Sequence, residues 1–315
     1  MISNRKKFDR PLLPVKCKGI SLIELMISML LGLVLVGAIS SVVLANIETF
    51  KTNQTLAEVQ DRARLTFEIL AREIREAGST GCAPDEPLES FLTNTPIPWW
   101  AGDSWNDSLT LYAANEVSPA IAFGDNVGNR INGTSALMIR RMGDEPWIVT
   151  ERLTSGFRVF SDVSTSEHDV RVGDAILTCD ARGVALFNAV APTGTNKKSI
   201  FYDASLNLSG YTLPMIGFLH AETWYVGHSS NNPSGRSLFR ARLTGSNIVT
   251  DEVVPGVTQF NVRRWSGNSN VIEMAFGLES ISHPSQRIER ALMSAADFCT
   301  EVGSQGFCYT IARRN

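Results

Sequence analysis

A run of 23 consecutive residues without a charge, from Leu25 to Ile47, constrains this chain more than any other feature. As a helix the run would span about 35 Å, because each helical residue rises ~1.5 Å, and that is enough to cross the hydrocarbon core of a bilayer. A buried core helix is the alternative, but an apolar surface on every side over this length favours a membrane helix. The sequence therefore predicts one membrane span near the N-terminus.

Basic residues are concentrated ahead of this apolar run. Residues 1–19 hold six of the 29 Lys and Arg residues and a single acid, Asp9, whereas Glu48 and Lys51 are the first charges after the run. The positive-inside rule then places the N-terminus in the cytoplasm and exports the rest of the chain. Without residues 1–19 the chain would hold 23 bases against 31 acids. Such an acidic chain lacks the general attraction for phosphate backbones, so no nucleic-acid partner is expected.

Glu24 lies inside the apolar stretch that begins at Ile20. An ionisable residue costs ~2.5 to 3.5 kcal/mol near the centre of a membrane helix and less near its end. One interpretation is an acid that is tolerated at the interface because it reaches back to the lipid headgroups. The residues around Glu24 suggest a second interpretation.

The segment Lys18-Gly19-Ile20-Ser21-Leu22-Ile23-Glu24 resembles the processing site of type IV prepilins. In that family a basic residue and Gly precede an apolar first mature residue, and Glu stands at the fifth mature position. The resemblance implies that prepilin peptidase cuts after Gly19 and methylates the new amine of Ile20, although Phe is more usual at that position. It also implies that Glu24 neutralises the N-terminal amine of a neighbouring subunit during assembly. Cleavage would place a cation about one turn from Glu24, at a helix end that is already partly positive.

Helical patterning continues beyond Ile47. An apolar stripe with steps of three or four residues comprises Val59, Ala63, Phe67, Leu70, Ile74 and Ala77. This spacing predicts a helix with one buried face. Three oppositely charged pairs at a spacing of four are Glu58 with Arg62, Glu68 with Arg72, and Arg72 with Glu76. Gly78 is suited to end the helix.

One unbroken helix from Ile20 to Ala77 would contain 58 residues and would be about 87 Å long. We expect its first segment, 20–47, to lie in the membrane and its second segment, 48–77, to pack a sheet on the apolar stripe. Pilins and pseudopilins share this arrangement. The resemblance therefore divides the chain into a leader of residues 1–19, these two helix segments, and an exported domain of residues 78–315.

After Gly78 short alternating runs separated by Gly, Asn, Asp, Ser and Pro predict strands and loops. The clearest candidates are Ile272–Glu279, Phe239–Leu243 and Phe260–Arg263, each with one buried and one wet face, and the weaker ones are Leu109–Ala113, Ala136–Arg141, Ala175–Thr178, Val184–Phe187 and Thr223–Val226. No regular helix separates these runs, so an antiparallel sheet is favoured. A second helix is expected near Gln286–Ala296. The fold class is thus α+β and pilin-like, with residues 78–315 forming one domain or two subdomains.

Further segments resemble the minor pilins of the PilW family. They are Leu70–Gly78 followed by Gly81-Cys82, then Trp224–Gly227, Ser237–Arg240 and Val253–Val257. The stretch from Pro84 to Asp174 shows little resemblance and is interpreted as loop. Within it, Trp99, Trp100 and Trp105 form an aromatic cluster, for which local core packing is favoured over an adhesive surface.

Four cysteines remain once Cys17 leaves with the leader. In an oxidising compartment an even number predicts disulfides. Four cysteines allow three pairings, of which we favour Cys82 with Cys179 and Cys299 with Cys308. A zinc site is the competing hypothesis, but the sequence has no C-x-x-C pair and His168, His220, His228 and His283 are scattered. No catalytic or nucleotide-binding motif is present, so we expect no enzyme activity, no metal and no cofactor.

The resemblance implies a structural function. The chain would be a minor pilin, cleaved and N-methylated by prepilin peptidase, that joins a complex priming type IV pilus assembly and enters the fibre or its tip. Its partners would be other minor pilins, the major pilin, prepilin peptidase and the inner-membrane assembly machinery, and the function would serve adhesion and twitching motility. It would cross the inner membrane once, with a periplasmic domain, before reaching the extracellular pilus. The alternatives are a J-like pseudopilin of type II secretion, and a signal-anchored exported enzyme or receptor that keeps its leader.

Overall fold

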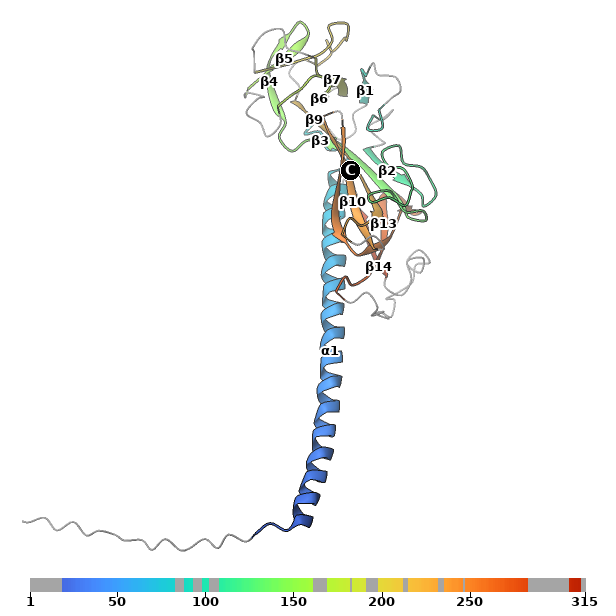
Figure 1. The fold of residues 1–315 in the computed structure, drawn as a ribbon. Helices are drawn as coiled ribbons and strands as arrows, with labels where there is room; N and C mark the ends of the chain where they lie inside the picture. The colour runs from blue at the N-terminus through green and yellow to red at the C-terminus, as the bar shows by residue number, and fades with distance from the viewer. Residues whose placement is uncertain are drawn as a thin grey trace, which may run out of the picture. The chain divides into compact units, whose positions relative to one another are not determined.

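The computed structural model describes residues 19–82, 88–92, 98–101, 108–160, 169–181, 183–190, 198–211, 215–231, 235–245, 247–282 and 306–312. The chain divides into two compact units, one that ends at Gln54 and one that begins at Thr55. A single helix, α1, runs from Leu22 to Glu76 (Figure 1). Its ends differ by at most two residues from those expected from the apolar and amphipathic patterns.

All the strands found in the described residues belong to the second unit. Their bounds are β1 Leu88–Ser90, β2 Leu109–Tyr112, β3 Ala136–Met142, β4 Trp147–Leu153, β5 Gly156–Val159, β6 Ala175–Asp180, β7 Gly183–Asn188, β8 Ser199–Phe201, β9 Met215–His228, β10 Arg236–Thr244, β11 Asn247–Pro255, β12 Val257–Trp265, β13 Asn268–Leu278 and β14 Gly306–Ala312. The layout is therefore α+β and pilin-like: one long N-terminal apolar helix followed by a mostly antiparallel β-domain.

The long strand β9 organises the larger sheet. Its residues 219–225 pair with β3 and its residues 222–228 pair with β10, which in turn pairs with β11. Its first residues, 215–218, pair with β4 and β6 instead. β9 thus belongs to two parts of one sheet, as Figure 1 shows. The expected antiparallel pairing is confirmed for the named strands, except that β1 runs parallel to β7.

The second half of α1 packs against both this sheet and a second, three-stranded sheet in the order β12-β13-β14. Leu70 and Ile74 are fully buried in one core with Trp224 of β9 and Phe260 of β12. The ring of Phe67 stacks on Tyr309 of β14 with 4.2 Å between the centroids. Every member of the predicted apolar stripe except the partly buried Phe67 is at most 6% exposed, so the predicted stripe is confirmed.

The stretch between Pro84 and Asp174 contains β1 to β5. β2 and β3 match the strand candidates at 109–113 and 136–141, whereas β1, β4 and β5 contradict the interpretation of the rest as loop. Between β2 and β3 the buried Arg130 holds the chain by donating hydrogen bonds to the carbonyl oxygens of Ala113, Glu116 and Thr134, at 2.8 to 3.1 Å. Burial lowers the pKa of Arg130 to about 10. Two of these carbonyls lie 14 and 17 residues from Arg130 in the sequence, so no short-range pattern indicates how this segment is held.

Two further expectations need correction. The predicted wet face of β13 is buried, because Ala275 is inaccessible and the side chain of Gln259 on β12 lies across Gly277. Glu68 pairs with Arg64 at 2.7 Å, on the turn before it, although Arg72 was expected as its partner. Trp100 lies in a core cluster, as favoured from the sequence, with Trp99 packed against it. Trp105 and the expected helix at 286–296 lie outside the described residues.

Two charged side chains of the helix, Arg62 and Glu58, bind residues at the end of β11 and just after β13. Arg62 donates to the carbonyl oxygen of Pro255 at 3.3 Å and pairs with Glu58 at 2.8 Å, as the sequence predicted. Glu58 accepts hydrogen bonds from the Ser280 hydroxyl at 2.8 Å and from the Ile281 amide at 3.1 Å. Burial raises the pKa of Glu58, but these hydrogen bonds outweigh it, so the pKa lies below its ordinary value of 4.5.

The substitution Glu58→Gln is expected to lower the free energy of unfolding by about 1 to 2 kcal/mol at pH 7, since a hydrogen-bonded charge is lost. The pKa of Glu58 is lower in the folded state than in the unfolded state, so its charge stabilises the fold above about pH 4.5. This stabilisation is lost as the pH falls through the folded-state pKa. The difference between the two proteins in urea midpoint should therefore shrink at pH 3. An equal difference at both pH values would show that the Glu58 charge does not stabilise the fold.

Candidate functional site

Helix α1 begins next to the predicted processing site. The amide of Leu25 donates to the carbonyl oxygen of Ser21 at 3.1 Å, so Ser21 is the residue at the helix N-cap. Glu24 then occupies the third helical position, and Ser21-Leu22-Ile23-Glu24 has the spacing of a capping box. An acid in this first turn is stabilised by the helix dipole. The capping position gives Glu24 a role in the helix itself, separate from the role that the prepilin resemblance implies.

Gly19 has no structural need to be glycine among the described residues. Its φ is outside the left-handed region, and no heavy atom lies within 4 Å of the position that a Cβ would take. Ile20, the next residue, is exposed. Lys18 lies outside the described residues. Folding therefore does not explain Gly19, whereas a protease that binds an extended backbone closely would require a residue without a side chain.

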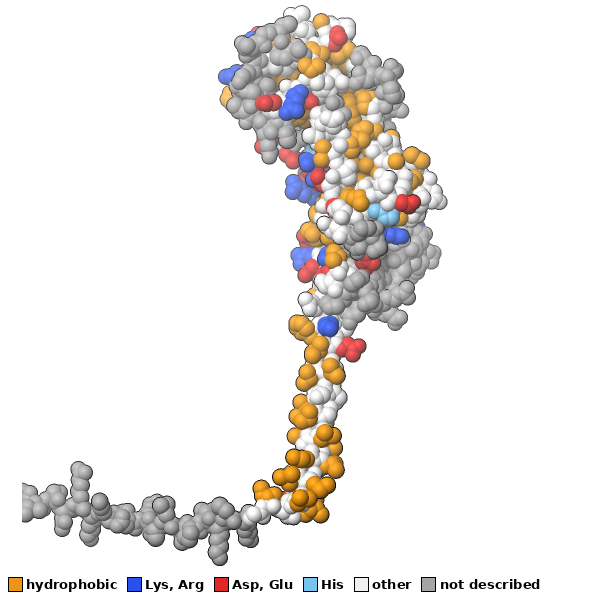
Figure 2. Space-filling model, in the orientation of Figure 1, with side chains coloured by type: hydrophobic (Ala, Val, Ile, Leu, Met, Phe, Trp, Pro, Cys, Tyr) orange, Lys and Arg blue, Asp and Glu red, His pale blue; other side chains and the backbone are white. Residues whose placement is uncertain are grey.

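The first half of α1 carries apolar side chains on every face. Leu, Ile, Val and Met residues from Leu22 to Ile47 are all at least 46% exposed. Figure 2 shows these side chains along the visible face of the helix. The segment is long and apolar enough to cross a membrane, and none of its most apolar window is buried. Apolar surface of this extent needs a bilayer or other apolar helices around it.

The other end of α1 is fastened to β3 through its backbone. Gly78 adopts a φ of 80°, which ends the helix in the left-handed region as its position predicted. Its amide donates to the carbonyl oxygen of Arg140 at 2.8 Å, and the amide of Met142 donates to that of Ser79 at 2.8 Å. These bonds fix the direction in which the chain leaves the helix.

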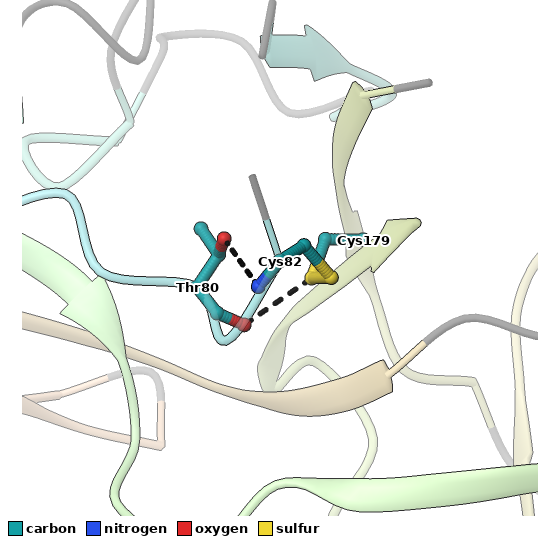
Figure 3. The surroundings of a disulfide bond; sticks show 3 residues. All are labelled: Thr80, Cys82 and Cys179. Carbon is teal, nitrogen blue, oxygen red and sulfur yellow. Dashed lines mark hydrogen bonds between the residues drawn. A yellow bond between two sulfur atoms is a disulfide. The ribbon is translucent and has the colours of Figure 1, made fainter. Parts of the chain in front are cut away.

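A disulfide continues this attachment. Cys82 is bonded to Cys179 of β6, the pair favoured from the sequence, and the amide of Cys82 donates to the Thr80 hydroxyl at 3.2 Å (Figure 3). The sulfur of Cys179 also lies 3.2 Å from the carbonyl oxygen of Thr80. This is a van der Waals contact and not a hydrogen bond, because a sulfur in a disulfide has no proton to donate. Cys299 and the side chain of Cys308 lie outside the described residues, so their pairing stays a prediction.

Replacing both Cys82 and Cys179 by Ala is expected to lower the free energy of unfolding by about 2 to 4 kcal/mol, because the bond closes a long loop in the unfolded chain. The two residues are 97 positions apart. The measurement is the urea midpoint of the full chain in detergent. Reductant should shift the wild-type midpoint toward that of the double variant. If the variant unfolds at the wild-type midpoint under oxidising conditions, this bond contributes no stability.

Charged side chains gather where the helix ends on the sheet. We call them the helix-end charge cluster, and they are Arg72, Glu73 and Glu76 of α1, Arg141 of β3, Asp144, His220 and Glu222 of β9, Arg240 and Arg242 of β10, and Asp251 of β11. Cross-strand register explains the grouping, because Arg141 lies opposite His220 and Arg242 lies opposite Glu222. Side chains at opposed positions lie on the same face of a sheet.

Arg141 joins the helix to β3 within this cluster. Its side chain is buried, and its Nε lies 3.7 Å from a carboxylate oxygen of Glu73 and 3.6 Å from one of Glu76. Its Nη1 lies 2.5 Å from Asp144. Burial raises the pKa of Glu73, and Arg141 opposes that rise. The guanidinium thus neutralises acids that come from two different elements.

Glu222 is the most deeply buried acid of the cluster. One of its oxygens lies 3.2 Å from His220 Nε2, and the other lies 3.8 Å from Arg240 Nε. Burial raises the pKa of Glu222 to about 7, and the charge of Glu73 adds to the rise. Burial also lowers the pKa of His220 to about 4, helped by the charge of Arg141. Between about pH 4 and pH 7 the pair therefore holds one proton and carries little net charge.

Sequence reasoning missed this cluster. Arg240 and Arg242 were assigned to a wet strand face, but Arg240 lies 3.8 Å from Glu222 and both arginines reach Asp251 at 3.0 to 3.3 Å. His220 was considered only as an isolated residue. The available signal is the alternation of charged or titratable residues on two neighbouring strands, His220 and Glu222 of β9 and Arg240 and Arg242 of β10. Among the described residues no group of three or more His, Cys, Asp or Glu side chains is placed to hold a metal ion.

A family model described as the prokaryotic N-terminal methylation motif matches residues 15–40. No curated protein and no solved structure matches the chain. The match covers the predicted processing site and the first turns of α1. The N-terminal part of the chain is therefore similar to type IV pilin-like substrates of prepilin peptidase. A motif of this type is typical of pilin-like proteins, which are attached to the membrane and have a structural role.

Proposed function

We propose that this chain is a minor pilin of the type IV pilus, of the PilW kind. In this proposal prepilin peptidase cuts after Gly19 and methylates Ile20, and the mature subunit crosses the inner membrane once with its β-domain in the periplasm. It then joins other minor pilins in a complex that primes assembly, and it enters the fibre or its tip with the major pilin. Residues 1–19 are the leader, 20–47 the membrane segment, 48–77 the amphipathic segment, and 78–315 the exported domain.

The observation that carries this proposal is the methylation motif that spans the start of an apolar helix with exposed side chains on every face. A signal anchor alone would explain the helix but not the Lys-Gly junction followed by Glu24 at the fifth mature position. Gly19 supports a protease site further, because the fold does not need glycine there. The segments Trp224–Gly227 and Val253–Val257, which resemble the PilW family, support the minor pilin over other subunits.

A J-like minor pseudopilin of type II secretion is the second candidate, because the same processing signal and helix serve both systems. The test is to delete the gene, count the surface pili of the resulting strain and measure how much protein it secretes. A minor pilin predicts loss of pili, normal secretion and rescue by the wild-type gene. Loss of secretion with normal piliation would favour the pseudopilin, and no change in either would contradict both.

A further inference from the structure

The helix-end charge cluster contains more negative than positive charge. Its five carboxylates, Glu73, Glu76, Asp144, Glu222 and Asp251, face four guanidiniums, those of Arg72, Arg141, Arg240 and Arg242. His220 cannot supply a fifth cation near neutral pH, because burial lowers its pKa to about 4. One carboxylate therefore lacks a full counter-charge. An uncompensated buried charge is strongly unfavourable, so a proton is expected on one of these acids.

Geometry selects Glu222 as that acid. Its side chain is 2% exposed, whereas the next most buried of the five, Glu73, is 12% exposed. Its closest guanidinium is 3.8 Å away, and the oxygen on that side accepts no hydrogen bond from any described residue. Asp251, by contrast, has two guanidiniums within 3.3 Å and is more exposed. Glu73 and Glu76 also each have an oxygen without a hydrogen bond from the described residues, at 3.6 to 3.7 Å from Arg141, so it is burial that singles out Glu222, which has the least access to water.

We propose that Glu222 is a proton-controlled latch that holds the last turn of α1 on the sheet. With the carboxyl group protonated, the cluster is balanced in charge and the helix end stays packed on β9 and β3. When the proton leaves, a second buried negative charge faces Glu73 of the helix, and the last turn opens more often. This inference concerns the β-domain alone and does not depend on the assembly function proposed above.

The titration of neighbouring groups sets the pH range of the latch. Glu222 has a pKa of about 7 in the packed state against an ordinary 4.5. Its stabilisation of the packed helix end is therefore fully present below about pH 4.5 and is lost as the pH rises through 7. His220 acts in the opposite sense, because its pKa falls from 6.5 to about 4. Between about pH 4.5 and 6.5 the packed and open states each hold one proton on this pair, and the two effects cancel.

Replacing one residue of the pair should therefore show how the other one, as it titrates, changes the protection of the helix end from hydrogen exchange. In His220→Gln only Glu222 titrates, so protection of the helix end should fall about tenfold between pH 6 and pH 8. In Glu222→Gln only His220 titrates, and protection should rise about fourfold over the same range. In the wild type the two partly cancel, which leaves a fall of about two- to threefold. The double variant should show no change.

The experiment is native-state hydrogen exchange on the full chain in detergent, corrected for the intrinsic exchange rate at each pH. The reporting amide is that of Gly78, which donates to Arg140 across the junction of helix and sheet, and the amide of Val159 on β5 is the internal control. The matched control variant is Glu252→Gln. The Glu252 carboxylate accepts hydrogen bonds from Ser229 and Ser237, which outweigh burial and keep its pKa low. Glu252→Gln should keep the wild-type pH profile.

The proposal is overturned if Glu222→Gln and His220→Gln give the same pH profile, since another group would then be titrating. Infrared difference spectra of the wild-type protein at pH 6 and pH 8 give a second readout that needs no variant to fold. A band from a buried protonated carboxyl group that disappears at pH 8 supports the latch. The absence of such a band at pH 6 contradicts it.

Discussion

Replacing Glu24 by Ala is expected to leave cleavage after Gly19 intact and to reduce surface pili in a complemented deletion strain to the level of the deletion itself. The proposed partner of Glu24 is the N-terminal amine of a neighbouring subunit, and the helix carries no other charge until Glu48. An amine left unpaired in such surroundings costs about 3 to 5 kcal/mol, and each 1.4 kcal/mol changes an equilibrium tenfold. A complex that must form before the fibre can grow would therefore rarely assemble.

The variant Glu24→Gln separates this charge from the capping role. Gln fits the third position of a capping box as Glu does, so Glu24→Gln keeps the capping spacing and removes only the negative charge. We expect Glu24→Gln to fail in the same way as Glu24→Ala, with both proteins present at wild-type levels in the membrane. Rescue by Gln but not by Ala would show that capping, not charge, is what assembly needs. Full rescue by Ala would remove any role for this acid.

Replacing Leu70 by Ala is expected to lower the free energy of unfolding by about 2 to 5 kcal/mol, because the substitution leaves a cavity in a close-packed core. Leu70 is inaccessible to solvent and shares its core with Trp224 and Phe260. Leu65, on the same helix, is 47% exposed and offers the matched control. Leu65→Ala should change stability by no more than about 0.5 kcal/mol.

The measurement is urea unfolding of the full chain in detergent, followed by the fluorescence of tryptophan, of which Trp224 lies in the core concerned. The linear dependence of the unfolding free energy on urea gives the difference between variants at their midpoints. Equal midpoint shifts for Leu70→Ala and Leu65→Ala would mean that the helix does not pack on the sheets through its apolar stripe. A large shift for Leu70→Ala alone is the result that the fold requires.

Local patterns predicted the parts of the fold that obey a short period. Leu70 and Ile74 could be placed on a buried helix face because apolar residues recur every three or four positions. Alternation likewise located β10 and β12, and the positive φ of Gly78 followed from its place after the last buried residue. The disulfide between Cys82 and Cys179 was favoured among three pairings, and the structure contains that bond.

Contacts between distant segments could not be predicted in this way. The burial of Glu222 depends on the register that sets it opposite Arg242 and brings β9 under the end of α1. Arg130 binds carbonyl oxygens of Ala113 and Glu116, which lie 17 and 14 residues away in the sequence, as well as that of the nearby Thr134. The shortest strands, β1 and β8, have three residues each, too few for an alternation to be recognised. Each of these features depends on tertiary structure rather than on a local sequence period.

The central claim is that the mature subunit starts at Ile20, and its most direct test is the mass of the N-terminal peptide. The chain should be purified from cells with active prepilin peptidase and from cells without it. The account predicts a peptide that begins at N-methylated Ile20 in the first case and an intact leader in the second. A protein that still begins at Met1 when the peptidase is active would contradict it.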